Sequence, residues 1–486
     1  MAFALGAGGE QPALPALRVG LPTEPVTLDP RYASDAVSYR LVRLLHRAPV
    51  DFDGAARPVA DLTTWERLAP RRYRFSLVAG ARFDDGSPVT AADVAATYRS
   101  VLDPARASPH RGSLANIARI EVIDTRSLDF VLSAADPLFP GTLVVGVLAA
   151  ADLAADDGRD AWRRGSGAFT RVAWRDDGSV TLRRRRDDQR VVFVTVRDPS
   201  VRAMKIISGE LDIVQGNLSP ELFRWLAARP GLVGQQVAGT TFSYLGFNLA
   251  DPITGRRALR QAIAHALDRE AIVRHVFSGT ARLAQAVFPP EHWAGAAGLA
   301  APGHDRDAAR RLLDAAGFGA GVRLTYKTSS DPFRLRLATI LQSQLAAVGI
   351  TLDIQSYDWG TFYGDVTHGR FQLYGLSWVG LRLPDIFRHA FHSASVPPTG
   401  ANRGRYASAR ADRLIEQAER TAERAARIAA YHALEEHLLY DLPYVPLWFE
   451  DQLVVTRSDI AGYSTDGAGS FDALAETTRK TPRGED

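Results

Sequence analysis

The chain has 486 residues and a mass of 52.9 kDa, more than an ordinary single domain, so its length predicts two or three compact units. Its 58 Lys and Arg residues nearly balance its 55 Asp and Glu residues and are interspersed with them, which is not the charge pattern of a nucleic-acid-binding protein. The absence of cysteine excludes disulfides, thiolate catalysis and cysteine metal sites, and it suits an oxidising compartment. No apolar run approaches the ~20 residues that a membrane-spanning helix needs.

Residues 1–16 are rich in small and apolar residues and resemble the end of a signal peptide that lacks its basic start. We interpret them as a leader remnant or linker, with an export signal that is truncated or absent. A short cytoplasmic N-terminus is the alternative interpretation. A bacterial lipoprotein anchor would need a Cys at the mature N-terminus, and the chain has none.

The first part of the chain is predicted to be rich in strands, with helices between them. Thr90 is expected to cap the N-terminus of a helix, with Asp93 at the third helical position. Leu17–Gly20 and Tyr73–Val78 are expected strands, Ser34–Arg47 is an expected helix, and Ile120–Asp124 pairs with Leu128–Ser133 in an expected hairpin.

From Gly165 onwards strands alternate with helices, which predicts an α/β fold. Gly349 is expected to end a helix. The expected strands are 191–196, 210–214, 244–248, 350–356, 371–377 and 444–449, after a hairpin around Asp177; the expected helices are 200–208, a long stretch 255–279, 332–348, 409–420 and 423–440. The pattern predicts two α/β lobes joined near residues 248–251, with the chain crossing back after Asp441.

Two local patterns that could indicate other functions have simpler interpretations. The basic run Arg183–Arg186 is followed at once by two aspartates, as in a solvated hairpin end. His432 and His437 are five residues apart and would point about 140° apart on a helix, so they do not form a zinc motif and are expected on a solvated face. We find no nucleophile elbow and no dinucleotide-binding glycine motif, so we expect neither a catalytic residue nor a cofactor or metal.

Five motifs, in order along the chain, resemble those of the dipeptide- and oligopeptide-binding proteins of ABC transporters, which are extracytoplasmic solute-binding proteins of family 5. They are EPVTLDP at 24–30, RFDDGSPVTAADV at 82–94, GSGAF at 165–169, SGELDI at 208–213, and FN at 247–248 with RALRQA at 257–262 and ALDREAI at 266–272. The resemblance covers about residues 17–460.

The resemblance implies an α/β, two-lobed periplasmic-binding-protein fold of class II, with a smaller domain inserted in the first lobe. Its expected boundaries are 17–48, 162–250 and 442–486 for the main domain of lobe 1, 49–161 for the inserted domain and 251–441 for lobe 2. The implied function is the substrate-binding component of an ABC-type importer, which captures a peptide or peptide-like solute and delivers it to the permease subunits. The implied protein is a periplasmic monomer and not an enzyme.

Residues from both lobes must face the ligand, because a ligand closes such a protein only through contacts that the closed form alone satisfies. The resemblance and the chemistry of the side chains nominate Glu24, Val26, Tyr244, Phe247, Asn248, Trp378, Val379, Gly380, Leu381, Arg382, Asp385, Asn402, Arg403 and Tyr406. The Gly-rich basic segment 400–406 is expected to border the cleft.

One departure from the family bears on the ligand. In its peptide binders a Trp is followed three residues later by an Asp that pairs with the peptide ammonium group, whereas here that position is Leu381. Three interpretations are open: Asp385 takes over the ammonium, the ligand has no ammonium, or Arg382 binds a ligand carboxylate or phosphate. A core position for Trp378 and an N-cap role for Asp385 are the structural alternatives. A non-peptide solute, such as an opine-like conjugate, an oligosaccharide or an anion, and a cytoplasmic sensor are the functional alternatives.

Overall fold

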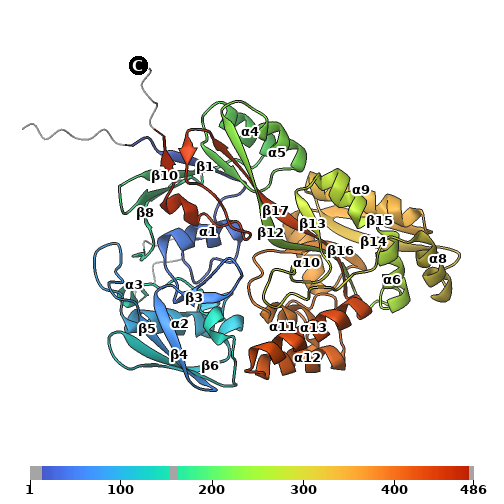
Figure 1. The fold of residues 1–486 in the computed structure, drawn as a ribbon, viewed down its shortest axis with the longest axis horizontal. Coiled ribbons are helices and arrows are strands. Elements are labelled where there is room, and N and C mark those ends of the chain that lie inside the picture. Colours follow the sequence, from blue (N-terminus) through green and yellow to red (C-terminus); the bar gives the residue numbers. More distant parts are fainter. Residues whose placement is uncertain (1–13, 154–162, 481–486) are drawn as a thin grey trace, which may run out of the picture.

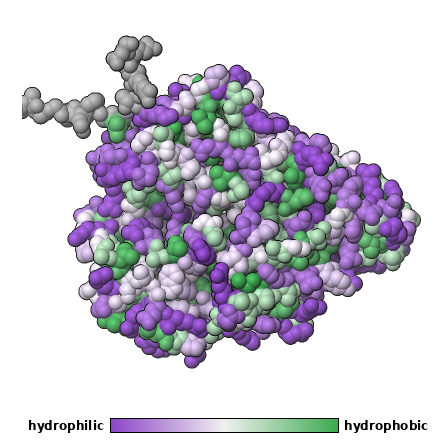
Figure 2. Space-filling view, in the orientation of Figure 1, coloured by the Kyte–Doolittle hydropathy of each residue, from purple (hydrophilic) through white to green (hydrophobic). Residues whose placement is uncertain are grey.

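The computed structural model describes residues 14–153 and 163–480, and it forms two lobes that share one large sheet (Figure 1). The predicted leader segment falls largely on residues 1–13, outside the described part. The surface in Figure 2 is mostly hydrophilic, with hydrophobic residues in small scattered groups. None of the helices in the described ranges is long and apolar enough to cross a membrane.

The shared sheet has eleven strands in the described residues and is mixed parallel and antiparallel. Its main path runs β15-β14-β16-β12-β17-β11-β1-β10-β9-β8, and β13 pairs with β17 beside that path. The strands are β1 (Leu17–Leu21), β8 (Phe169–Trp174), β9 (Val180–Arg184), β10 (Arg190–Thr195), β11 (Ile213–Gln215), β12 (Leu232–Phe247), β13 (Ala281–Leu283), β14 (Val322–Ser329), β15 (Ile350–Tyr357), β16 (Leu373–Trp378) and β17 (Tyr444–Arg457).

The long antiparallel strands β12 and β17 carry the chain between the lobes. The first half of β12 pairs with the part of β17 that also pairs with β11, and its second half pairs with β16 of the other lobe. The pairing of β12 and β17 shifts register between Val237 and Thr241, opposite Gln452 and Glu450. The sequence-based junction near residues 248–251 is therefore displaced, because β12 crosses in its middle and 248–251 follow its end.

Lobe 1 has a parallel core of β1, β10 and β11, and its helices pack on these strands and on their neighbours in the sheet. These helices are α1 (Ala36–Leu45), α4 (Pro199–Ile207) and α5 (Pro220–Ala227), capped by Asp35, Asp198 and Ser219. The predicted β8–β9 hairpin is confirmed. Arg184 of the basic run is 1% exposed and bonds to Asp187 and two backbone carbonyls, so the run is only partly solvated. A short ribbon of β18 (Ile460–Ala461) and β19 (Thr478–Arg479) ends the lobe.

A smaller domain is inserted between α1 and β8 and lies at lower left in Figure 1. Its sheet has the order β4-β5-β7-β6 and buries a cluster around Phe75, Phe130 and Phe139 against α2. The predicted capping box of Thr90 and Asp93 is present. The elements are β2 (Val50–Phe52), β3 (Pro58–Ala60), β4 (Thr63–Ala69), β5 (Arg72–Leu77), α2 (Ala91–Leu102), β6 (Ile117–Val122), β7 (Ser127–Leu132) and α3 (Ala150–Leu153).

Lobe 2 surrounds β14, β15 and β16 with helices. The long helix expected over 255–279 is wrong: Leu267 takes an extended backbone conformation, and the side chain of Asp268 caps a new helix. Gly349 has a φ of 91° and follows α9, as predicted. The helices are α6 (Arg257–Ala266), α7 (Arg269–Ile272), which continues as a π-helical turn (Val273–Phe277), α8 (Arg306–Ala315), α9 (Pro332–Ala346), α10 (Trp359–His368), α11 (Asp385–Phe391), α12 (Ala409–Arg420) and α13 (Arg424–Asp441).

Candidate ligand-binding site between the lobes

The loop that follows β16 reaches from lobe 2 to lobe 1. The Arg382 Nη1 atom lies 3.4 Å from Asp51 Oδ1, and its Nη2 atom lies 3.7 Å from Asp466 Oδ2. The same guanidinium group lies 5.4 Å from the centre of the Phe52 ring. The next residue, Leu383, fits against Gly141 of the inserted domain, where a Cβ atom would come within 2.9 Å of it. Two carboxylates of lobe 1 thus already neutralise the charge of Arg382, so Arg382 would attract a ligand anion less strongly than an unpaired arginine would.

Beside this loop, aromatic and cationic side chains of lobe 2 form a continuous wall. Trp359 and Tyr363 on α10 are stacked, with ring centres 5.5 Å apart. Arg403 donates to the Tyr363 hydroxyl at 3.0 Å and lies 4.6 Å from the Trp378 ring, which lies 6.0 Å from the His389 ring. We call Trp359, Tyr363, Arg403, Trp378 and His389 the aromatic wall.

The aromatic wall faces open space at several points. Trp359 and Val379 are more than half exposed, Tyr363 is 36% exposed and Trp378 is half-buried. Exposed aromatic groups that adjoin one another are typical of ligand-binding surfaces. Trp378 packs with one side against the apolar cluster beneath the wall, as the core alternative predicts. The residue is only half-buried, so that alternative describes only part of its surroundings.

Asp385 lies one helical turn before His389 on α11, so both side chains lie on the same face of that helix. Asp385 is an exposed residue, although protein atoms closely surround its carboxyl. Burial raises its pKa to about 7; backbone N–H groups of the first helical turn oppose that rise, and Asp136 and Glu419 add to it. The predicted N-cap role is wrong, because Asp385 is the first helical residue and Pro384 holds the cap position with no side-chain hydrogen bond.

Several nominated residues serve the architecture of lobe 2. Tyr244 and Phe247 are fully buried on β12, although the Tyr244 hydroxyl accepts a hydrogen bond from Arg403 at 3.2 Å. Asn248 donates to the carbonyls of residues 369 and 371. Asn402 and Tyr406 are buried. The Asn402 side chain donates to the Tyr406 carbonyl and accepts from its backbone N–H, which holds the 400–406 loop in shape, while the Tyr406 hydroxyl donates to Asp441. Of this loop, Arg403 alone reaches the aromatic wall.

The remaining nominated residues lie in the loops of the two lobes. In lobe 1, Val26 is 70% exposed, and its backbone N–H donates to Ser38 Oγ. Glu24 is exposed and pairs with Arg197 at 3.0 Å. In lobe 2, Gly380 has a φ of 69°, which favours glycine and turns the loop between Trp378 and Arg382. Leu381 packs against the apolar cluster that supports Trp378.

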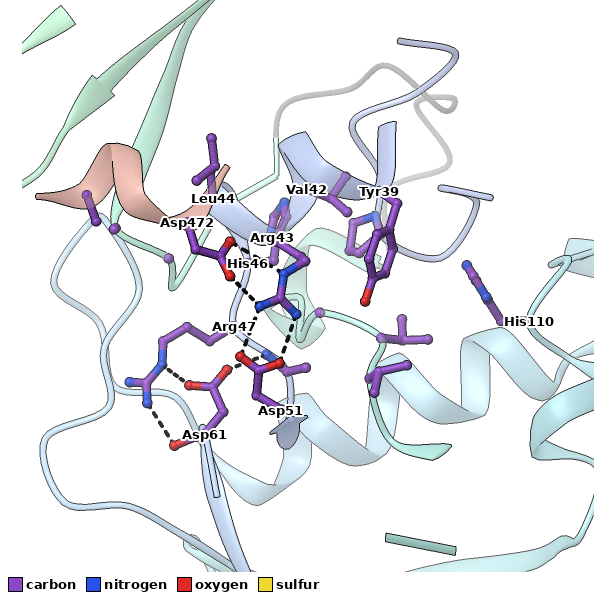
Figure 3. A pocket seen from close by; sticks show the side chains of 18 residues that line it. Tyr39, Val42, Arg43, Leu44, His46, Arg47, Asp51, Asp61, His110 and Asp472 are labelled. Carbon is purple, nitrogen blue, oxygen red and sulfur yellow. Dashed lines mark hydrogen bonds and ion pairs between the residues drawn. The ribbon is translucent and has the colours of Figure 1, made fainter. Parts of the chain in front are cut away.

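A cavity of about 250 Å³ lies within lobe 1, where α1 meets the inserted domain. Figure 3 shows Arg43 at its centre, between Asp472 and Asp51, with Arg47 bonded to Asp61. Burial lowers the pKa of His46 in its wall to about 4, so this imidazole is neutral at pH 7. Because Asp51 is also a partner of Arg382, the loop of lobe 2 reaches the edge of this cavity.

The two histidines on α13 are not arranged for a metal. His432 approaches the carbonyl of Gly295, and His437 approaches Ser408 and Asp441. His437 has a side chain that is only 10% exposed, so the expected solvated face is wrong for it, because α12 and its cap cover that side. Across residues 14–153 and 163–480, no group of His, Asp and Glu side chains has the arrangement of a metal site.

Sequence reasoning missed Tyr363, Trp359 and His389 of the wall and Asp51 opposite Arg382. The pair Trp359 and Tyr363 has the i, i+4 spacing of one helix face, a signal that was available in the sequence. The partner of Arg382 lies 331 residues away in the chain, and no local pattern indicates it.

Comparison with solved structures shows which class of fold the chain has. The chain superposes on the periplasmic binding protein of Helicobacter pylori solved with the peptide STSA, with a TM-score of 0.82 and 23% identity over 96% of this chain and 98% of that one. A binding protein of A. tumefaciens R10, solved with agropinic acid, gives the same TM-score and identity over 96% and 99%. The chain therefore has the two-lobed fold of periplasmic binding proteins, as predicted.

Sequence comparison identifies the family. The model of the bacterial extracellular solute-binding proteins, family 5, matches residues 59–394. A di/tripeptide-binding protein of Pseudomonas aeruginosa strain UCBPP-PA14 is 26% identical over 454 residues, which cover 82% of this chain and 84% of that protein. The chain belongs to family 5 of the bacterial extracellular solute-binding proteins, which confirms the resemblance seen in its motifs. Its role is that of the substrate-binding component of an ABC-type importer.

Proposed function

We propose that this chain captures a peptide or peptide-like small solute between its lobes and hands it to the permease subunits of its importer. The proposal depends mainly on the position of the 378–385 loop. This loop places Trp378 and Asp385 beside a direct contact between Arg382 and lobe 1. A solute held there contacts both lobes, as coupling of binding to closure requires. The peptide ligands named for similar proteins support this class of solute.

We further propose that Asp385 holds the ammonium group of the solute. It is the acidic residue of this loop, and its raised pKa reflects a carboxyl without a cationic partner among the described residues. A ligand ammonium would supply that partner and draw the proton from the carboxyl. Leu381 packs into the wall's supporting cluster and provides no charge.

The same site suits an opine-like conjugate, which also carries amine and carboxylate groups, and the neighbour solved with agropinic acid supports this second candidate. The finer features of the proposal are extracytoplasmic location, a monomeric state and the absence of catalysis. The family, whose members are extracellular solute-binding proteins, supports the first of these features.

Thermal-shift screening and calorimetry with dipeptides, tripeptides, opine-like conjugates and oligosaccharides test the proposal. We expect binding of amine-bearing solutes that Trp378→Ala weakens about fivefold to tenfold, because the variant removes an aromatic contact worth about 1–1.5 kcal/mol. Trp225→Ala is the matched control, since Trp225 is a 40% exposed tryptophan on α5 of lobe 1. Equal affinities in wild type and Trp378→Ala would place the ligand elsewhere.

A further inference from the structure

Arg403 is a buried cation with no acidic partner in the part of the chain that the structure describes. It is 6% exposed, and none of the carboxylates in the described ranges forms an ion pair with it. Arg382, Arg388 and Arg334 of the same lobe pair with Asp or Glu. Arg260 and Arg269 are equally buried and lack such a pair, but each donates to several backbone carbonyls. Guanidinium stays charged at every physiological pH, and a buried charge without a counter-ion is costly. In the described ranges the Arg403 side chain has neither a carboxylate nor a backbone carbonyl as acceptor, so a ligand anion would complete its surroundings.

The hydrogen bonds of Arg403 are also incomplete. Two of its five N–H donors reach the hydroxyl groups of Tyr244 and Tyr363, at 3.2 and 3.0 Å. Its Nε atom is buried without a partner, and so is the indole Nε1 atom of Trp378, whose ring lies 4.6 Å from the guanidinium group. Two unpaired buried donors therefore occur side by side, next to an unpaired positive charge.

The surroundings define what could satisfy these donors. The guanidinium group lies between the faces of Tyr363 and Trp378, so an approaching anion meets aromatic rings on both sides. Guanidinium binds planar carboxylates through paired N–H groups, and the rings favour an apolar or aromatic neighbour of that carboxylate. The exposed flank of Tyr363 and Val379 gives a solute a way to reach the wall.

We propose that Arg403, with the Trp378 indole, forms an anion subsite that binds the carboxylate of a solute whose adjoining group is apolar or aromatic. The inference deepens the proposed function, on which it rests for the location of the cleft. Together with Asp385 it defines a solute with two charged ends, the ammonium toward α11 and the carboxylate toward the 400–406 loop.

Sodium benzoate and benzamide are the probes, because they have the same shape and differ in charge. With the full chain at constant ionic strength, we expect benzoate to bind with roughly millimolar affinity. At ten times its dissociation constant it should raise the Tm by about 1 °C, whereas benzamide should not. Arg403→Met should abolish the benzoate shift, and Arg403→Lys should reduce it. Arg323→Met is the control, because Arg323 is an exposed arginine of β14 and its loss should leave the shift unchanged.

A second measurement separates a binding role from a structural one. In chloride buffer, Arg403→Met should keep or raise the Tm, because it removes a buried charge that has no counter-ion. A lower Tm together with an unchanged benzoate shift would show that Arg403 only supports the tyrosines, and would overturn the inference. No benzoate shift in the wild type, or one that benzamide reproduces, would overturn it as well.

The outcomes also separate this inference from the proposed function. If peptides bind and Arg403→Met leaves their affinity unchanged, the importer role stands and the anion subsite falls. If no peptide or opine-like conjugate binds but the Arg403-dependent benzoate shift is present, the subsite stands and the proposed class of solute falls.

Discussion

Arg382 is expected to stabilise the closed arrangement of the lobes, and Arg382→Ala tests this. The side chain is 15% exposed and makes three contacts with lobe 1: Asp51 at 3.4 Å, Asp466 at 3.7 Å and the Phe52 ring at 5.4 Å. Partly exposed ion pairs contribute about 0.2–1 kcal/mol each, and an exposed cation–π contact about 0.5–1 kcal/mol. The sum is about 1–3 kcal/mol, so the ratio of closed to open molecules without ligand should fall by a factor of about 5 to 150.

The absence of cysteine makes closure measurable by energy transfer between two introduced thiols. Glu66→Cys on β4 and Gln417→Cys on α12 are exposed and lie on the inserted domain and on lobe 2, respectively. We expect the closed population to fall in Arg382→Ala. Raising the salt concentration should produce part of the same change in the wild type, because exposed charges are screened.

Arg388→Ala is the matched control, since Arg388 pairs with Glu419 inside lobe 2 at 2.6 Å. It should leave the lobe distance unchanged. A closed fraction that Arg382→Ala does not alter, or that both variants alter equally, would refute the reasoning.

Three further predictions concern charges in and around lobe 2. Affinity for an amine-bearing ligand should rise as pH increases through about 7, where Asp385 loses its proton, and calorimetry of Asp385→Asn should show no such rise. Glu435 is 1% exposed and burial raises its pKa to about 7, so the folded form keeps a proton that the unfolded form releases. Stability should then fall by about 3 kcal/mol between pH 4.5 and 7, and urea unfolding of Glu435→Gln should lack this loss. Glu450→Ala leaves Arg334 of α9 without its partner on β17 and should lower the free energy of unfolding by about 2 kcal/mol. The control Arg323→Ala, at an exposed arginine, should lower the free energy of unfolding by less than about 0.5 kcal/mol.

Most single elements were predictable because their signals are local. The Thr90 capping box and the Gly349 helix end depend on a few neighbouring residues, and both are present. The full length of β12 was not predictable, because Gly234 and Gly239 interrupt its apolar alternation, and pairing with β17 and β16 holds it extended. The break at Leu267 was hidden by a hydrophobic period that continues across it.

The site was also predictable only where its signals are local in the sequence. Trp378, Arg382, Asp385 and Arg403 could be nominated as chemistry-bearing residues of two segments, but not assigned their partners. Asp51 meets Arg382, and Tyr363 meets Arg403, only through tertiary packing. An unpaired charge is a property of the folded surroundings, so the sequence alone could not separate Arg382, which has acidic partners, from Arg403, which has none.

Arg382 and Arg403 are expected to affect two different factors of the affinity for a ligand, namely the closed fraction and the intrinsic affinity of the closed form. Observed affinity is the intrinsic affinity of the closed form multiplied by the fraction of molecules that can adopt it. Arg382 contacts the other lobe, so its loss should weaken every ligand by one common factor, whatever its chemistry. The side-chain hydrogen bonds of Arg403 go to Tyr244 and Tyr363 on the lobe 2 side, so its loss should weaken carboxylates and leave neutral ligands unchanged. Both effects should multiply in the double variant, because one side chain acts on closure and the other on the ligand.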